Sequence, residues 1–418
     1  MLRTKLQIGL AALLTFVIFL GNYRLRAVDV EAYRPGHTGP DVLAQLDALD
    51  DALDEGAAES MQEIFPEGYV FTWALYGLAW VQVGMNEPPH SELRARAVAE
   101  ARRAVDAIDS GQGKAPFVDH TLLRWGAFYN GWLARLRGGV LVIDEPASAG
   151  EVEEFERRCD LIADALRASD TPFLESYRGG TWPADTVVAV SALRLHDHLF
   201  EPRYTDVIDA WLAKADTRMD SKTGLIAHRS HPDTGEPTVY ARGSSQALML
   251  RFLIDIDPEL AREHYAVFRQ RFADVRAGMV PGVREYRKGR DGPADVDSGP
   301  ILLGYSGPAT VVGMGTALSF GDRALAEPLL RGLELVGTPH TWDGKKRYTF
   351  GLLPVGEAFV VWSKTAQPWV SQVPQDMEFE PLMSDGWLWR WHLISLALVL
   401  LIWLGVYFLW RGRKLDTP

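Results

Sequence analysis

Two long uncharged apolar stretches, one toward each end, constrain this chain more than any other feature. The first runs from Leu6 to Tyr23 and the second from Trp391 to Trp410. A helix rises about 1.5 Å per residue, so each stretch is long enough to cross the hydrocarbon core of a bilayer. We therefore predict four regions: an N-terminal transmembrane anchor at 1–23, an ectodomain at 24–386, a C-terminal transmembrane helix at 387–411 and a tail at 412–418.

Basic residues beside the spans predict the orientation, because Lys and Arg gather on the cytoplasmic side. Two of them lie on each side of the first span, which leaves it undecided. Arg411, Arg413 and Lys414 follow the second span, whereas Arg390 alone precedes it. We expect a bacterial-type inner-membrane protein with both termini cytoplasmic and a periplasmic or extracellular ectodomain. The residues after the first stretch offer no small-x-small cleavage site, so an anchor is favoured over a signal peptide.

The ectodomain is acidic. The whole chain has a formal charge of −12 and each membrane end contributes +2, which leaves −16 for residues 24–390. Such a domain repels phosphate backbones, so we expect no nucleic-acid partner. The single cysteine, Cys159, excludes an intrachain disulfide and a Cys-pair metal site, but it does not decide the compartment.

Apolar residues recur at three- and four-residue spacing throughout the ectodomain, which indicates helices. The expected ranges are 41–54, 72–85, 91–109, 120–138, 150–168, 184–200, 203–217, 244–256, 258–276, 308–320, 322–337 and 352–366. One short β-like insertion covers 224–229 and 237–241. No linker of biased composition divides the region, so we predict one all-α domain, an (α/α)6 toroid of about twelve helices with this insertion. A generic helical bundle is the alternative.

Four segments rich in polar, aromatic and glycine residues interrupt this pattern. They are 175–185, 227–230, 240–246, and 283–287 running on to 295–300. Most lie at or just before a predicted helix start, where free backbone N–H groups favour carboxylates and anionic ligands. In a toroid these starts converge on one mouth, so we expect a pocket there.

Three acids in these segments are candidate catalytic residues. Asp185 precedes an apolar helix, where it could act as a general acid or base or serve as an N-cap. Asp297 follows Asp295 by two residues, a pair that could form an acid/base couple, bind a metal or make a turn. Glu285 is the third candidate. We predict no bound metal and no cofactor.

The other candidates would assist or bind the substrate. His228, on the β-like insertion, fits a pocket-facing base or a solvated side chain. Arg242 could hold a ligand by its planar fork or pair with Asp297 or Glu285. Aromatic side chains of the same segments suit sugar faces and isoprenoid chains alike, and we predict that they bind substrate: Tyr177, Trp182, Tyr240 and Tyr286.

The segments 182–197, 224–229, 242–252 and 295–300 together resemble the linalool dehydratase/isomerase domain family, over roughly 120–330. Members of that family are α/α toroids, and the named enzyme interconverts a monoterpene alcohol and a triene by acid/base chemistry in an apolar pocket. The segment 125–132 is similar to the family's pocket-lining inner helix, which makes Trp132 a further substrate-binding candidate. The family's cysteines and histidine are missing, because Ala184 and Trp132 stand where they are expected. The resemblance therefore implies the fold and not the terpene reaction.

These observations favour a membrane-anchored, cofactor-independent lyase or isomerase acting on an apolar or isoprenoid-like substrate. Two alternatives stay open. The segment 240–243 also resembles one in six-hairpin glycosidases, whose chemistry needs two carboxyl groups beside one bond. A non-catalytic envelope protein that binds ligands or assists assembly is the other. The expected partners are a small-molecule, lipid-like or glycan substrate and the membrane.

Overall fold

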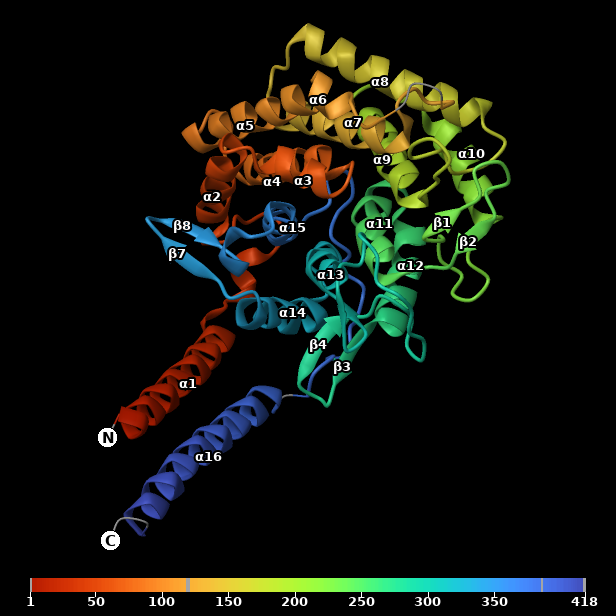
Figure 1. The fold of residues 1–418 in the computed structure, drawn as a ribbon. Coiled ribbons are helices and arrows are strands. Elements are labelled where there is room, and N and C mark those ends of the chain that lie inside the picture. Colours follow the sequence, from red (N-terminus) through yellow and green to blue (C-terminus); the bar gives the residue numbers. More distant parts are fainter. Residues whose placement is uncertain (1, 118–120, 385, 416–418) are drawn as a thin grey trace.

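The computed structural model describes residues 2–117, 121–384 and 386–415, and it is mostly helical (Figure 1). The α-helices are α1 (Leu2–Ala27), α2 (Val42–Asp54), α3 (Ala57–Ile64), α4 (Gly68–Asn86), α5 (Glu92–Ile108), α6 (Gly111–Lys114), α7 (Gly126–Ile143), α8 (Ala149–Ala168), α9 (Pro183–Leu199), α10 (Thr205–Asp216), α11 (Gly243–Ile256), α12 (Pro258–Phe272), α13 (Gly307–Ser319), α14 (Arg323–Val336), α15 (Pro354–Lys364) and α16 (Trp387–Leu415). Two short 3-10 helices are η1 (Val30–Tyr33) and η2 (Thr349–Gly351). The strands are β1 (Arg229–Ser230), β2 (Pro237–Val239), β3 (Ala273–Arg276), β4 (Val280–Val283), β5 (Ile301–Leu302), β6 (Tyr305–Ser306), β7 (His340–Trp342) and β8 (Lys345–Arg347).

The predicted helical class is confirmed, and a helix occupies each of the twelve expected ranges. Three ranges need correction. The helix expected at 72–85 is α4, which starts at Gly68. The helix expected at 120–138 is α7, which starts at Gly126, and residue 120 lies outside the described part of the chain. The helix expected at 258–276 ends at Phe272, because residues 273–276 pair antiparallel with 280–283 as a hairpin. Gly278 has a φ of +67° in the turn of this hairpin, a conformation that glycine adopts without strain.

Four two-stranded hairpins are present among the described residues, where the sequence predicted one β-like insertion. The hairpin of β1 and β2 is that insertion. The other three lie in the segments before α13 and α15. Their strands have two to four residues, too few for the alternation of apolar and polar residues that marks a strand in sequence.

Six helices pack in a closed series: α4, α7, α9, α11, α13, α15 and again α4. We call these six helices the inner ring. Phe71, Phe128 and Phe359 lie in the first two turns of three of them, and their ring centroids are 5.1 and 5.3 Å from that of Phe71. These helices therefore begin at the same end, which we call the mouth. Other helices, among them α2, α5, α8, α12 and α14, pack against the outside of the inner ring (Figure 1).

The segment 365–383 runs across the inner helices near the end opposite the mouth. The carboxylate of Asp255, in the last turn of α11, accepts the backbone N–H groups of Trp369 and Val370 at 3.0 Å each. The Arg135 guanidinium lies 4.1 Å from the Trp369 ring centroid, and Val373 packs against Gly321 after α13. This segment contacts several inner helices at the end opposite the mouth. A ligand that enters at the mouth therefore does not contact it.

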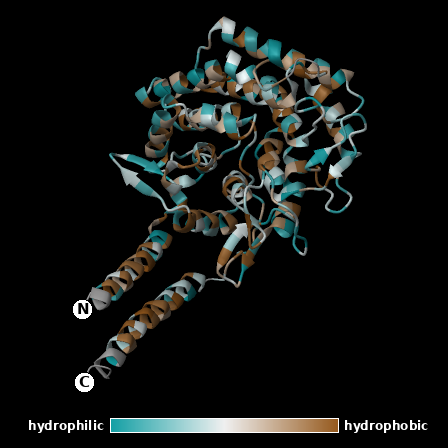
Figure 2. Ribbon diagram, in the orientation of Figure 1, coloured by the Kyte–Doolittle hydropathy of each residue, from teal (hydrophilic) through white to brown (hydrophobic). Residues whose placement is uncertain are grey.

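Two helices are long and apolar enough to cross a membrane: Lys5–Ala27 of α1 and Trp387–Arg411 of α16. They project side by side from the helical domain, and both are apolar along their length (Figures 1 and 2). Almost none of either segment is buried, unlike the core helix of a soluble protein. Both predicted spans are therefore present as candidate membrane helices. Of the predicted tail, residues up to 415 continue α16, and 416–418 lie outside the described residues.

Polar side chains join the two candidate spans. The Asn22 side chain donates to the Ser395 hydroxyl at 2.8 Å and accepts from His392 at 2.5 Å. Further along, the Trp403 indole donates to the Thr15 hydroxyl at 3.0 Å. Hydrogen bonds between helices hold membrane segments together, because lipid offers polar groups no alternative partner. The spans therefore form one hairpin-like pair.

Candidate functional site

Asp185 lies in the first turn of α9, at the mouth. Trp182 is the N-cap residue of that helix, so the alternative assignment of Asp185 as the N-cap is wrong. The Asp185 side chain is buried, and burial raises the pKa of its carboxyl to about 8. The negative charges of Glu67 and Asp297 act in the same direction, whereas Ser176 opposes them. At neutral pH this carboxyl is mostly protonated and able to donate a proton.

Trp132 of α7 lies beneath this carboxyl. It is fully buried, and its indole contacts Phe252 and Trp362 edge-on at 5.6 and 6.3 Å between centroids. Its N–H interacts with Asp185 and lowers the pKa of that carboxyl. Among the described residues, however, this N–H meets no acceptor at hydrogen-bonding geometry. A buried donor without a full partner is uncommon, and a polar ligand group could satisfy it.

Asp297 lies in the segment between β4 and β5, which reaches across the mouth. Half of its side chain is exposed, and the Nε2 atom of His228 is 3.5 Å from one carboxylate oxygen. The surrounding protein removes water from the Asp297 carboxyl, and this desolvation, followed by the charges of Asp295 and Glu67, raises its pKa to about 6. At neutral pH this carboxyl is mostly ionised. The pKa values of Asp297 and Asp185 therefore lie on opposite sides of neutrality.

His228 joins Asp297 to α11. Its side chain is buried, and its Nδ1 atom is hydrogen-bonded to the hydroxyl of Ser245 in the first turn of that helix. Burial, followed by the charge of Arg242, lowers its pKa to about 3, so the ring is neutral at physiological pH. A neutral imidazole in this position orients a carboxylate but cannot serve as the proton donor.

Arg242 and Glu285 form a second group beside the first. The Arg242 guanidinium is paired with Asp295, is 3.9 Å from a Glu285 oxygen and lies over the Tyr286 ring at 5.2 Å. Glu285 is fully buried and accepts the Ser244 hydroxyl at 2.8 Å, and burial raises its pKa to about 7. Of the two pairings predicted for Arg242, the one with Glu285 is present at long range, and Asp295 is the closer partner. This group holds the start of α11 against the segment after β4.

Glu67, which the sequence analysis missed, completes the site. It directly precedes Gly68, the first residue of α4, and it interacts with Asp185, Asp297 and the hydroxyl of Tyr177. Burial and then Glu67 raise the pKa of Tyr177. The predicted helix began at residue 72, four residues too late, and so left Glu67 out. The signal was present in an acid between Pro66 and a glycine, just before a long apolar run.

We call Glu67, Asp185 and Asp297 the acid cluster. The predicted aromatic residues divide around it. The rings of Tyr177 and Trp182 are in contact, 5.0 Å between centroids, and Trp182 also interacts with Asp297.

Tyr286 lies beside Arg242 instead, and its hydroxyl donates to the Pro293 carbonyl at 2.8 Å. Tyr240 lies outside the cluster with its side chain exposed, and no contact to the acids is found among the described residues. The structure thus brings together Asp185, Asp297, His228, Tyr177, Trp182 and Trp132.

A cavity of about 770 Å³ lies elsewhere, between α8 and the segment before α7, and none of the predicted residues lines it. Its buried charges are matched, since Asp109 pairs with Arg158 at 2.9 Å. We place the site at the acid cluster because it combines unmatched carboxyls, an unsatisfied indole donor and a pair of aromatic rings in contact. Within residues 2–117, 121–384 and 386–415, no group of three or more His, Cys, Asp or Glu side chains is arranged to hold a metal ion.

The chain matches no protein-family model and no curated protein sequence. The resemblance to the linalool dehydratase/isomerase domain family therefore stays a prediction. A functional assignment must rest on the chemistry of the acid cluster.

Proposed function

We propose that this protein is a membrane-anchored acid/base enzyme that cleaves a C–O bond, with lyase or isomerase chemistry of the linalool dehydratase/isomerase type. The observation that carries the proposal is the pair Asp185 and Asp297, whose pKa values are raised to about 8 and about 6. Neighbouring carboxyls with separated pKa values supply an acid and a base at the same pH.

The reaction needs one proton donor and one proton acceptor. Asp185 donates its proton to the oxygen of the leaving hydroxyl, which departs as water with the electron pair of the C–O bond. Asp297 removes a proton from the adjacent carbon, and that C–H electron pair forms the new double bond. The reverse sequence hydrates the alkene, so the pair also supports isomerisation. General acid/base catalysis of this kind contributes about a hundred- to ten-thousandfold to a rate.

The neighbours have positioning roles in this scheme. His228 and Ser245 orient Asp297, and Glu67 fixes the hydroxyl of Tyr177 beside the leaving group. Trp132 offers its unsatisfied N–H to a bound oxygen atom. The rings of Phe71 and Phe359, together with the aromatic residues deeper in the inner ring, contact the apolar skeleton of the substrate.

A glycan-directed hydrolase is the second candidate. The aromatic pair Tyr177 and Trp182 beside three carboxyls favours it, since sugar rings stack on aromatic faces and glycosidases use two carboxyl groups. Isotope-labelled water distinguishes the two reactions. Elimination releases an unlabelled alkene product, whereas hydrolysis of a glycoside places the label on the anomeric carbon of the liberated sugar. The purified full-length protein should therefore be incubated with allylic alcohols and with alkyl glycosides, and the products analysed by mass spectrometry.

We also propose a two-span topology with both termini cytoplasmic and the helical domain in the periplasm or outside the cell. The three basic residues after the second span support it. A reporter that is active only outside the cytoplasm should be active when inserted near Gly111 and silent when fused after Pro418. The opposite pair of results would exclude this topology.

A further inference from the structure

The exposed apolar residues of the helical domain are concentrated in two segments. In the described part of 24–386, the six most exposed large apolar side chains all lie in 273–306 or 336–353. They are Leu302, Leu303, Val336, Trp342, Phe350 and Leu352, with exposed fractions of 69 to 82%. We call these six residues the apolar rim. Scattered apolar residues on a surface are ordinary, but a group of this size marks an interaction site.

The segment 336–353 contacts the end of α1 that lies nearest the helical domain. The Arg24 guanidinium donates to the Pro339 carbonyl at 2.6 Å, and the ring of the next residue, His340, stacks on Phe350 at 5.2 Å. Val336 follows Leu335, which packs on a small cluster with Leu25. The apolar rim therefore begins where the first candidate span leaves the helical domain.

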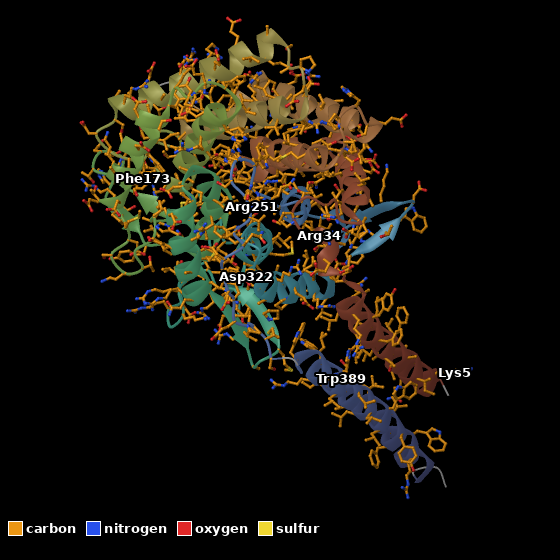
Figure 3. The ribbon with its side chains drawn as sticks, turned by 180° about the vertical axis from the view of Figure 1, so that it is seen from behind. Lys5, Arg34, Phe173, Arg251, Asp322 and Trp389 are labelled. Atoms are coloured by element: carbon orange, nitrogen blue, oxygen red, sulfur yellow. The ribbon has the colours of Figure 1, made fainter. Side chains whose placement is uncertain are left out.

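The segment 273–306 contacts the end of α16 that lies nearest the helical domain. The Trp391 indole donates to the Met279 carbonyl at 2.9 Å in the turn between β3 and β4. The Tyr305 hydroxyl donates to the next carbonyl, that of Val280, at 3.0 Å. Leu302 and Leu303 form the end of the hairpin to which Tyr305 belongs. Figure 3 shows the labelled Trp389, two residues before Trp391, at the end of α16 nearest the helical domain.

Charge distinguishes the same two segments from the rest of the domain. Residues 273–306 contain five basic and five acidic side chains, and 336–353 contain three basic and one acidic. The two segments together have a net charge of +2. Because residues 24–390 have a net charge of −16, the rest of this region has a net charge of −18. Anionic headgroups repel an acidic surface and tolerate a neutral or basic one. These segments are therefore the part of the domain that can approach a lipid surface.

We propose that the apolar rim docks into the bilayer interface beside the two spans and that substrate reaches the acid cluster from the membrane. Exposed Trp, Phe and Leu side chains are the usual interfacial anchors. Asp297 lies only five residues before Leu302, so the segment that enters the interface also carries the catalytic base. The class of substrate rests on the proposed function: a neutral amphiphile, with an apolar chain and a hydroxylated head, because the ionised Asp297 carboxylate repels an anionic head.

The docking is tested on the full-length protein in lipid nanodiscs. Leu302→Cys and, as a matched control on the outer helix α8, Leu161→Cys are labelled with an environment-sensitive fluorophore. The native Cys159 is buried and does not compete for the label. We expect a blue-shifted emission at position 302 that lipids with a shallow quencher reduce, and neither effect at 161. Equal, water-like emission at both positions would overturn the docking.

The route of the substrate is tested by a second measurement that does not depend on turnover. A photoreactive long-chain prenyl alcohol in the nanodiscs should crosslink to the mouth in the wild type and in Asp185→Asn. The double variant Leu302→Ser and Leu303→Ser should reduce the yield about tenfold, the factor that a loss of about 1.4 kcal/mol produces. An unchanged yield would overturn entry through the rim. Crosslinking with no turnover in any variant would reject the proposed reaction and leave the docking intact.

Discussion

Two polar clusters in this domain place their carboxyls in opposite electrostatic environments. Beside α15, a lysine network joins Lys364 and Lys346 to Asp41 and Glu334, with N–O distances of 2.6 to 3.0 Å. At the mouth, the acid cluster brings the carboxyls of Glu67 and Asp297 close to that of Asp185. Burial alone would raise the pKa values of Asp41 and Glu334 in the network and of Asp185 and Asp297 at the mouth. In the network the two lysines outweigh burial and hold the pKa values of Asp41 and Glu334 below their usual range.

This comparison separates matched buried charges from unmatched ones. The network has one cation for each carboxylate, and it links the start of α2 to the ends of α14 and α15. Within the described part of the chain, no cation is in direct contact with Asp185, so this carboxyl stays protonated at neutral pH and costs stability when it ionises. An arrangement that destabilises the fold and is retained in a mouth lined by aromatic rings is typical of a catalytic site.

The largest effect is expected from Asp185→Asn. Asn keeps the shape of the side chain but cannot transfer a proton, so turnover should fall by about a hundred- to ten-thousandfold. The melting temperature should stay near that of the wild type, because the native carboxyl is already uncharged at neutral pH. Steady-state kinetics and thermal unfolding measure the two quantities. Retained activity would remove Asp185 from the mechanism and leave Asp297 as the candidate acid.

The network should respond in the opposite way to Lys364→Met. Removing a buried cation leaves Asp41 and Glu334 without part of their compensation, which typically costs about 3–5 kcal/mol in the free energy of unfolding. Denaturant unfolding measures this loss. Lys345→Met is the matched control, because Lys345 is a solvent-exposed partner of Asp51 and should change stability very little. Equal effects of the two substitutions would show that the network is not a structural centre.

The pH dependence of kcat/KM should be bell-shaped. Activity should fall below about 6 as Asp297 becomes protonated and above about 8 as Asp185 ionises. Asp297→Asn should leave a slow enzyme without the acidic limb of the profile. The same measurement on Lys346→Met should keep both limbs, since the network does not touch the reacting groups. A flat profile for the wild type between pH 5 and 9 would contradict the assignment of acid and base.

The pH dependence of stability should differ in sign between the two clusters. The pKa of Asp185 is raised from 3.8 to about 8, so its contribution to stability is fully present at low pH and is lost as the pH rises through that range. The pKa values of Asp41 and Glu334 are lowered, so their contribution is present at neutral pH and is lost on acidification. Unfolding curves across pH should therefore be flatter above pH 4 in Asp185→Asn, and flatter below pH 4 in Asp41→Asn. A shared response would mean that the clusters are not electrostatically distinct.

The sequence alone predicted both spans and twelve helices of the ectodomain, and it missed the short helices α3 and α6. A helix of 3.6 residues per turn imprints its buried face on nearby residues, and Gly, Pro and Asp mark its ends, so all twelve ranges could be predicted. The two apolar stretches are local in the same sense. The prediction that Asp185, Asp297 and His228 share one site also came from local order, because all three lie in polar segments that interrupt the helical pattern.

Only the tertiary structure decided which charges are matched. Lys364 meets Asp41 across 323 positions of sequence, and Glu67 reaches Asp185 from a different inner helix. The pKa of a buried group depends on the water that folding removes and on the charges that folding brings close. Neither quantity is encoded in the residues beside it. That is why the sequence could propose Asp185 as an acid, while the raised pKa that would make it one arises from packing between helices distant in the chain.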